Sequence, residues 1–209
     1  MAETVSRYPA TLSIDYPEEL NRLTTLLRIF MVIPIAIVLA LLAGNGNDEA
    51  GQQGLRLELG GGGLVVLPTV LLLLFRYKYP RWWFDWNLAL TKFITRVLAY
   101  LALLRDEYPS TDEEQAVHID IPYPDVRTEL NRWLPLVKWL LAIPHYIVLV
   151  FLDIAVVIVV IIAWFAILFT RGYPRALFDF VVGVFRWQLR VAAYAFLLTT
   201  DRYPPFSLS

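Results

Sequence analysis

Long apolar runs alternate with short polar segments along the chain. Residues 133–170 form one such run, interrupted by little more than Lys138, His145 and Asp153. As one helix, at about 1.5 Å per residue, this run would be about 55 Å long, whereas the hydrocarbon core of a bilayer is only ~30 Å thick. We therefore predict a turn near Asp153 that folds the run into a hairpin of two membrane spans. The two predicted spans cover about 134–152 and 154–170.

Sequence matches at two fixed offsets indicate that the chain contains two related units. The triplet Leu-Asn-Arg at 20–22 returns at 130–132, an offset of 110 residues. The triplet Tyr-Pro-Arg at 79–81 returns at 173–175, an offset of 94 residues. The two offsets differ by 16 residues, which is the length of the polar segment GNGNDEAGQQGLRLEL at 44–59. We interpret this segment as an insertion in the first unit.

Each unit is predicted to contain the same parts in the same order. An extended piece comes first, TLSIDYP (11–17) or VHIDIPYP (117–124), whose alternation and β-branched residues favour short strands. A hairpin of apolar helices follows, and an aromatic-rich helix at 81–104 or 175–198 comes last. The predicted repeats cover residues 1–110 and 111–209, and the first hairpin has spans at about 26–43 and 60–75.

The last helix of each unit carries one acidic and two basic residues. Spacings of 7 and 4 place the three on one helical stripe. The stripe residues are Asp85, Lys92 and Arg96 in the first unit, and Asp179, Arg186 and Arg190 in the second. In one interpretation the basic residues face anionic lipid headgroups from an amphipathic surface helix. In the other the stripe pairs internally, with Asp85 and Asp179 meeting Arg28 and Lys138 or a neighbouring arginine.

The distribution of basic residues bears on whether these last helices cross the membrane. If they cross, the chain has six spans and inverted repeats; if they lie on the surface, it has four spans and parallel repeats. With four spans, only Arg56 of the 18 lysine and arginine residues lies on the far side, which is a strong positive-inside asymmetry. We therefore predict an all-α membrane protein with two parallel tandem repeats, each a transmembrane hairpin followed by an interfacial helix. Short strands and both termini would lie on the cytoplasmic side.

Composition agrees with a membrane protein. Hydrophobic residues make up 58% of the chain and charged residues 18%, and the mean hydropathy is +0.56. A soluble domain is nearer half apolar and a quarter charged. The first 20 residues carry several acidic residues and no apolar core, which is not the pattern of a cleavable signal peptide. The net charge of −1 gives no bulk attraction to nucleic acid, and without cysteine the chain has no thiolate metal site, disulfide or thiol nucleophile.

The dipeptide Tyr-Pro occurs seven times, and we predict that each copy is a corner held at the membrane surface. Proline starts or ends helices, and tyrosine prefers the membrane–water interface. The seven tyrosines are Tyr8, Tyr16, Tyr79, Tyr108, Tyr123, Tyr173 and Tyr203. The aromatic residues that we predict to anchor the last helices at the interface are Tyr79, Trp82, Trp83, Trp86, Tyr173 and Trp187.

The sequence contains no recognisable catalytic constellation. A metal site needs several converging ligands, and His118 and His145 are the only histidines, so we expect each to find a local partner. The four glycines at 60–63 lack the lysine and Ser/Thr of a phosphate-binding loop. We find no nucleophile–base pair, paired-carboxylate site or dinucleotide fingerprint. We therefore expect no enzymatic activity, no metal and no cofactor.

The phrase FTRGYPRALFDFVVGVFRWQLRVAAYAFLLTTDRYPPFSL, residues 169–208, resembles the prokaryotic membrane family named domain of unknown function 4389. Both halves of the chain carry the pattern, and its most specific part runs from Phe178 to Phe206. The first half departs from the pattern at Trp82 and Trp83 and by its long loop at 44–63. The resemblance implies a membrane protein with this tandem layout. It implies no activity and no catalytic residue.

Together these patterns predict a non-enzymatic, multi-pass protein of a prokaryotic cytoplasmic membrane. We expect a structural or accessory subunit that engages lipids and partner membrane proteins, or further copies of itself, and does not bind nucleic acid. The aromatic-rich last helices favour this function. The alternative is a small oligomeric transporter or channel, in which helix-breaking prolines and intramembrane basic residues line the path.

Overall fold

The computed structural model describes residues 8–42, 61–111 and 113–209, which are mostly helical. The elements are β1 (Thr11–Ile14), α1 (Arg22–Leu42), α2 (Gly61–Leu71), the π-helical turn η1 (Leu72–Arg76), α3 (Arg81–Leu101), β2 (Val117–Asp120), α4 (Val126–Glu129), α5 (Pro135–Leu141), α6 (Ile143–Thr170) and α7 (Arg175–Ala195). The predicted strands and the two last helices are therefore present. The predicted insertion at 44–59 lies outside the described residues.

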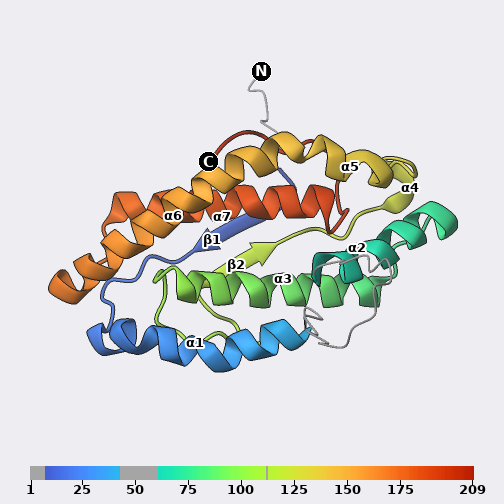
Figure 1. Ribbon diagram of the computed structural model, residues 1–209. Helices are drawn as coiled ribbons and strands as arrows, with labels where there is room; N and C mark the ends of the chain where they lie inside the picture. Colours follow the sequence, from blue (N-terminus) through green and yellow to red (C-terminus); the bar gives the residue numbers. More distant parts are fainter. Residues whose placement is uncertain (1–7, 43–60, 112) are drawn as a thin grey trace, which may run out of the picture.

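A two-stranded antiparallel sheet lies between the two inner helices (Figure 1). In its register Thr11 faces Asp120 and Ile14 faces Val117. The helix α7 packs on β1 and α3 packs on β2, while α6 lies along α7 and α1 lies along α3. Each strand therefore packs on the inner helix of the other half of the chain. The main core forms where the inner faces of these elements meet.

The inner helices α3 and α7 begin directly after a Tyr-Pro dipeptide. Pro80 and Pro174 are extended residues at the helix start, where a proline loses no helical hydrogen bond. Both helices end earlier than predicted, at Leu101 and Ala195, because the chain turns into the left-handed region just beyond each end. The φ angles there are 62° at Leu103 and 56° at Leu198. The prediction that proline starts these helices is confirmed.

The predicted turn near Asp153 is wrong, because α6 is one continuous helix of 28 residues. The Asp153 carboxylate accepts a hydrogen bond from the Gln188 side chain at 2.6 Å, so its polar group is satisfied without a turn. The hairpin of the second half instead joins α6 to α7 through residues 171–174. The spans predicted at about 134–152 and 154–170 are therefore not the two arms of a hairpin. In the first half, the connection between the predicted spans at about 26–43 and 60–75 falls mainly on residues 43–60, outside the described residues.

Contacts between the two halves come in matched pairs. The Tyr16 hydroxyl donates to the Tyr173 carbonyl, and the Tyr123 hydroxyl donates to the Tyr79 carbonyl. In the same way Arg22 donates to the carbonyl of Phe169 at 2.7 Å, and Arg132 donates to the carbonyl of Leu74 at 2.5 Å. Each half therefore contacts the other through one tyrosine and one arginine that donate to main-chain carbonyls.

Candidate functional site

The charged stripe of α7 supplies two arginines to an open cavity beside β1, which we call the arginine cavity. The cavity has a volume of about 890 Å³. Its polar lining residues are Tyr8, Thr11, Ser13, Arg186, Arg190, Arg202, Tyr203, Ser207 and Ser209. None of the described residues that line it is acidic, so its side-chain charge is positive.

The guanidinium groups of Arg186 and Arg190 also tie α7 to neighbouring main chain. Arg186 donates to the carbonyls of Leu12 and Leu208, at 3.1 Å each. Arg190 donates to the carbonyl of Ser207 at 3.3 Å and to the main-chain oxygen of Ser209. These bonds fix the segment after α7 against β1 and hold both guanidinium groups at the cavity.

Electrostatics at this pair favour an anion. Arg190 is only 8% exposed, and its Nε has no hydrogen-bond partner among the described residues. Burial and the positive charge of Arg186 lower the pKa of Arg190. A phosphate or carboxylate in the cavity would offset the repulsion between the two guanidinium groups.

The stripe of α3 is built differently. Arg96 is buried and donates to the carbonyl of Ser110 at 2.8 Å, so it too holds the segment that follows its helix. Lys92 is half-buried, and Asp85 is exposed, as is Asp179 on α7. Lys92 and both aspartates form no ion pair with a described residue. In both stripes the arginines contact the segment that follows the helix, and the aspartates are exposed.

The interpretation in which Asp85 and Asp179 meet Arg28 and Lys138 is wrong. Arg28 pairs with Asp106, and Lys138 pairs with Asp201 at 2.7 Å. Arg28 also lies over the ring of Tyr100, 4.4 Å from its centroid, and Lys138 lies 5.1 Å from the centroid of Tyr194. The acidic partners come from the loops after α3 and α7 and not from the helices themselves.

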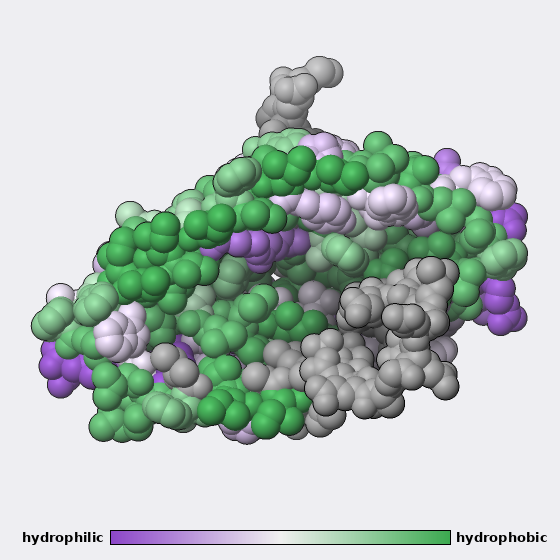
Figure 2. All heavy atoms as spheres, in the orientation of Figure 1, coloured by the Kyte–Doolittle hydropathy of each residue, from purple (hydrophilic) through white to green (hydrophobic). Residues whose placement is uncertain are grey.

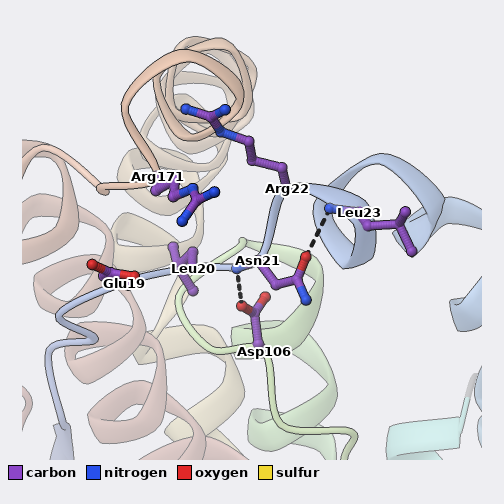
Figure 3. Close-up of a pocket in the computed structure, with 7 residues that line it drawn as sticks. All are labelled: Glu19, Leu20, Asn21, Arg22, Leu23, Asp106 and Arg171. Atoms are coloured by element: carbon purple, nitrogen blue, oxygen red, sulfur yellow. Dashed lines mark hydrogen bonds between the residues drawn. The ribbon is translucent and has the colours of Figure 1, made fainter.

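Asp106 has a second role at the start of α1, where it lines a cavity of about 470 Å³ (Figure 3). Its carboxylate accepts from the Asn21 main-chain N–H at 2.6 Å, and the Asn21 side chain accepts from the Leu23 N–H at 2.9 Å. Figure 3 shows Arg22 and Arg171 on the opposite side of this cavity. Because Asp106 is already committed to Arg28 and Asn21, the arrangement is that of a structural joint.

The second half builds the same joint with different residues. Asp201 accepts from the Asn131 N–H at 2.5 Å, and the Asn131 side chain accepts from the Trp133 N–H at 2.9 Å. Asp106 and Asp201 are not among the site residues predicted from the sequence. A signal was present, because each stands two residues before the Tyr-Pro that follows its inner helix. Arg202 and Tyr8 line the arginine cavity and were not predicted either. No match between the two repeats points to them.

The predicted interface anchors divide into two groups. Trp82 and Trp86 are exposed, and Trp83 stacks on Trp86 with ring centroids 5.2 Å apart. The other three anchors are buried: Tyr79 and Tyr173, each only 1% exposed, and Trp187. The Tyr79 hydroxyl donates a hydrogen bond to the carbonyl of Leu197 at 3.0 Å, so Tyr79 links the two halves. The prediction that these three lie at an exposed membrane interface is wrong.

Each histidine has a local partner, as expected. His145 is buried, accepts a hydrogen bond from the Trp187 indole at 3.1 Å and stacks on Phe206. His118 lies on the exposed face of β2, 3.3 Å from the Asp15 carboxylate. Among the described residues, no group of three or more His, Asp or Glu side chains is placed to hold a metal ion.

Comparison with known proteins gives a match to a protein family. Residues 133–207 match the family model described as Domain of unknown function (DUF4389). No curated protein and no solved structure matches the chain. The matched residues begin at the joint before α5 and run through α6 and α7 to the segment that lines the arginine cavity. The resemblance drawn from the YPRALFDF phrase is therefore confirmed over residues 133–207.

Proposed function

We propose that this protein is a non-enzymatic membrane protein that binds anionic lipid headgroups in its arginine cavity. It serves as a structural or accessory subunit for partner membrane proteins. The cytoplasmic membrane of a prokaryote is its proposed location, with both termini on the cytoplasmic side.

The observation that carries the proposal is the outer surface of α6. Within the part of the chain that the structure describes, α6 is the one helix that is long and apolar enough to cross a membrane. Its buried positions are His145, Leu149, Val156, Ala163 and Ile167. These positions form one narrow stripe, so most of the circumference of an apolar helix is exposed. A helix that is apolar all round and exposed is not stable against water, and lipid or another protein must cover it.

Two equivalent structural units are part of the proposal. The matched ion pairs Arg28–Asp106 and Lys138–Asp201 support it, because each links the same elements of its own half. The reciprocal tyrosine bonds between the halves support it as well. Such an arrangement makes a compact double unit that presents its outer helices, α1 and α5–α6, on the outside.

The arginine cavity supports the lipid part of the proposal. A lipid phosphate near a membrane surface would meet Arg186 and Arg190 already held in place by main-chain carbonyls, so little side-chain freedom would be lost on binding. Planar guanidinium groups suit phosphate oxygens because they donate two parallel hydrogen bonds.

Liposome flotation tests the headgroup function. Vesicles of phosphatidylcholine alone and vesicles with added phosphatidylglycerol would be compared for the unchanged protein, for the double variant Arg186→Gln/Arg190→Gln, and for Arg127→Gln. Arg127 is an exposed residue of α4 outside the cavity and serves as the control for loss of a positive charge elsewhere on the surface. We expect the double variant to lose most of the preference for anionic vesicles while its helical circular dichroism is kept. An unchanged preference would exclude the cavity as the headgroup site.

Isolation from native membranes in mild detergent tests the accessory part. Foreign membrane-protein subunits in stoichiometric amount would support it. A homo-oligomer that carries only lipid would oppose it and would favour the alternative prediction, a small oligomeric transporter or channel, for which liposome flux is the next measurement.

A further inference from the structure

The helices α6 and α7 run side by side in opposite directions over most of their length (Figure 1). Near the start of α6, His145 accepts a hydrogen bond from Trp187, and further along the helix Asp153 accepts one from Gln188. The depth of a residue of α6 in a membrane therefore sets the depth of the α7 residue beside it. Any orientation of α6 in lipid fixes where the middle of α7 lies.

The middle of α7 carries polar groups that a bilayer centre does not accept. Arg186 and Arg190 stand there and open into the arginine cavity. At the middle of α6 itself, Asp153 is exposed and bonded to Gln188. If α6 crossed the bilayer, these charges would lie near mid-depth, where each ionised side chain is costly.

A water-facing surface lies beside the same region. In β1 the side chains of Leu12 and Ile14 turn inward and Ser13 turns outward, as alternation in a strand requires. On the outer face, the Asp15 carboxylate meets His118, and both side chains are more than half exposed. Because β1 also accepts from Arg186 through the Leu12 carbonyl, this polar sheet face is fixed at the level of the middle of α7.

The apolar surface lies on other elements. Figure 2 shows hydrophobic residues covering α5, α6 and α1 on the face in view. On α6 the exposed large residues include Ile147, Ile154, Ile161 and Phe165, each more than half exposed. On α1, Phe30 is 69% exposed. The exposed apolar surface thus lies on the outer helices, whereas the outward side chains of the sheet are polar.

We infer that this protein lies in one side of the membrane, with α6 and α1 parallel to the bilayer plane, their outer faces in the hydrocarbon and the sheet and arginine cavity at the water interface. The inference rests on the proposed membrane function and replaces the predicted set of crossing helices. It places Arg186 and Arg190 at headgroup depth, where anionic lipid is found.

Depth measurement along α6 tests the inference, and the absence of cysteine from the chain makes single-cysteine labelling clean. The variants Ile147→Cys, Ile154→Cys, Ile161→Cys and Phe165→Cys would be labelled with a fluorophore. All four sites lie on the same outward face, because they are spaced by about two turns or one turn. Quenching by lipids that carry a spin label at different acyl positions then gives the depth of each site. Ser13→Cys on the polar sheet face serves as the water-exposed control.

A helix in the plane gives the same depth at all four sites, within a few ångströms. A crossing helix changes depth by up to ~1.5 Å per residue, which amounts to about 21 Å between residues 147 and 161. Equal depths, with Ser13→Cys open to an aqueous quencher, would support the inference. A steady change of depth through the bilayer centre would overturn it and leave the membrane function intact. If no lipid quencher reaches any α6 site, the proposed membrane function itself fails.

Discussion

Lys138 and Asp201 form an ion pair that links α5 to the segment after α7. The Lys138 ammonium lies 2.7 Å from the Asp201 carboxylate and 2.7 Å from the Thr200 carbonyl. Lys138 is fully buried, whereas the Asp201 side chain is 21% exposed. Lys138 is therefore no sign of a transport path, although it lies in an apolar run, because its charge is neutralised by an aspartate of its own half of the chain.

Removal of the carboxylate should cost more than removal of the ammonium. Asp201→Asn keeps the shape but leaves a buried positive charge unpaired, and we expect the free energy of unfolding to fall by about 3–5 kcal/mol. Lys138→Met removes the charge itself and should cost less. The double variant should recover part of the loss of Asp201→Asn. Denaturant unfolding in detergent micelles, followed by circular dichroism, measures all three.

A matched control is available on the surface of α7. Asp179 is exposed and forms no ion pair with a described residue, so Asp179→Asn should change the free energy of unfolding by less than about 0.5 kcal/mol. If Asp201→Asn were as mild as Asp179→Asn, the Lys138 pair would not be a stabilising contact.

Sequence patterns predicted local features of this site better than its pairings. The helical spacing placed Arg186 and Arg190 on one stripe correctly, because spacing along a helix determines which face a side chain occupies. The acidic partners of Arg28 and Lys138 could not be chosen in the same way. They depend on where the loops after α3 and α7 return, and Asp106 and Asp201 are remote in sequence from the residues they bind.

The turn predicted at Asp153 failed for a related reason. Its basis was bilayer thickness, which assumes that a long apolar run must cross and return. A carboxylate within such a run needs a partner, and a turn into water is only one way to supply it. Gln188, from the next helix, supplies the partner and leaves α6 continuous. Tertiary contacts of this kind are not visible in hydropathy.

The reciprocal tyrosine contacts between the halves predict two substitutions of similar effect. Tyr16 meets the Tyr173 carbonyl and packs edge-on against Phe178, and Tyr123 meets the Tyr79 carbonyl in the same manner. Tyr16→Phe and Tyr123→Phe keep the ring and remove one hydrogen bond. We expect each to lower the free energy of unfolding by about 1 kcal/mol.

Tyr108→Phe is the control for this pair. Its hydroxyl forms no hydrogen bond with a described residue, and its ring contacts Tyr100 only edge-on. The midpoint of thermal unfolding should shift for the first two variants and stay for the third. A shift for only one of Tyr16 and Tyr123 would show that the two contacts are not equivalent.

Gly183 marks a close approach between α7 and the segment that follows it. A Cβ at this position would lie 3.0 Å from both the Cβ and the carbonyl oxygen of Leu208. Gly183→Ala should therefore push Leu208 away, although its carbonyl accepts from Arg186. We expect overpacking to cost about 1–3 kcal/mol, offset in part by the better helix propensity of alanine.

Gly172→Ala provides the comparison for Gly183→Ala. A Cβ on Gly172 would have its nearest neighbour at 3.8 Å, an ordinary contact. This variant should be close to neutral in the same unfolding measurement. Equal stability of the two variants would mean that the segment at Leu208 yields freely to a methyl group.

Stability at low pH should depend on Glu107, which joins the loop after α3 to the start of β2. Burial alone would raise the pKa of Glu107, but the hydrogen bond from Arg105 at 2.7 Å, the Ala116 N–H and the Arg105 charge outweigh it, so the pKa lies below its usual value of 4.5.

A carboxyl group with a lowered pKa stabilises the fold above its unfolded pKa. That contribution is lost as the pH falls through the folded value. Because the Glu107 side chain is 44% exposed, we expect less than about 1 kcal/mol. In denaturant unfolding between pH 7 and pH 3, Glu107→Gln should reduce stability at neutral pH and flatten the loss below about pH 4.5, while the exposed control Glu113→Gln keeps the slope of the unchanged protein. Equal slopes for Glu107→Gln and the unchanged protein would contradict this role of Glu107.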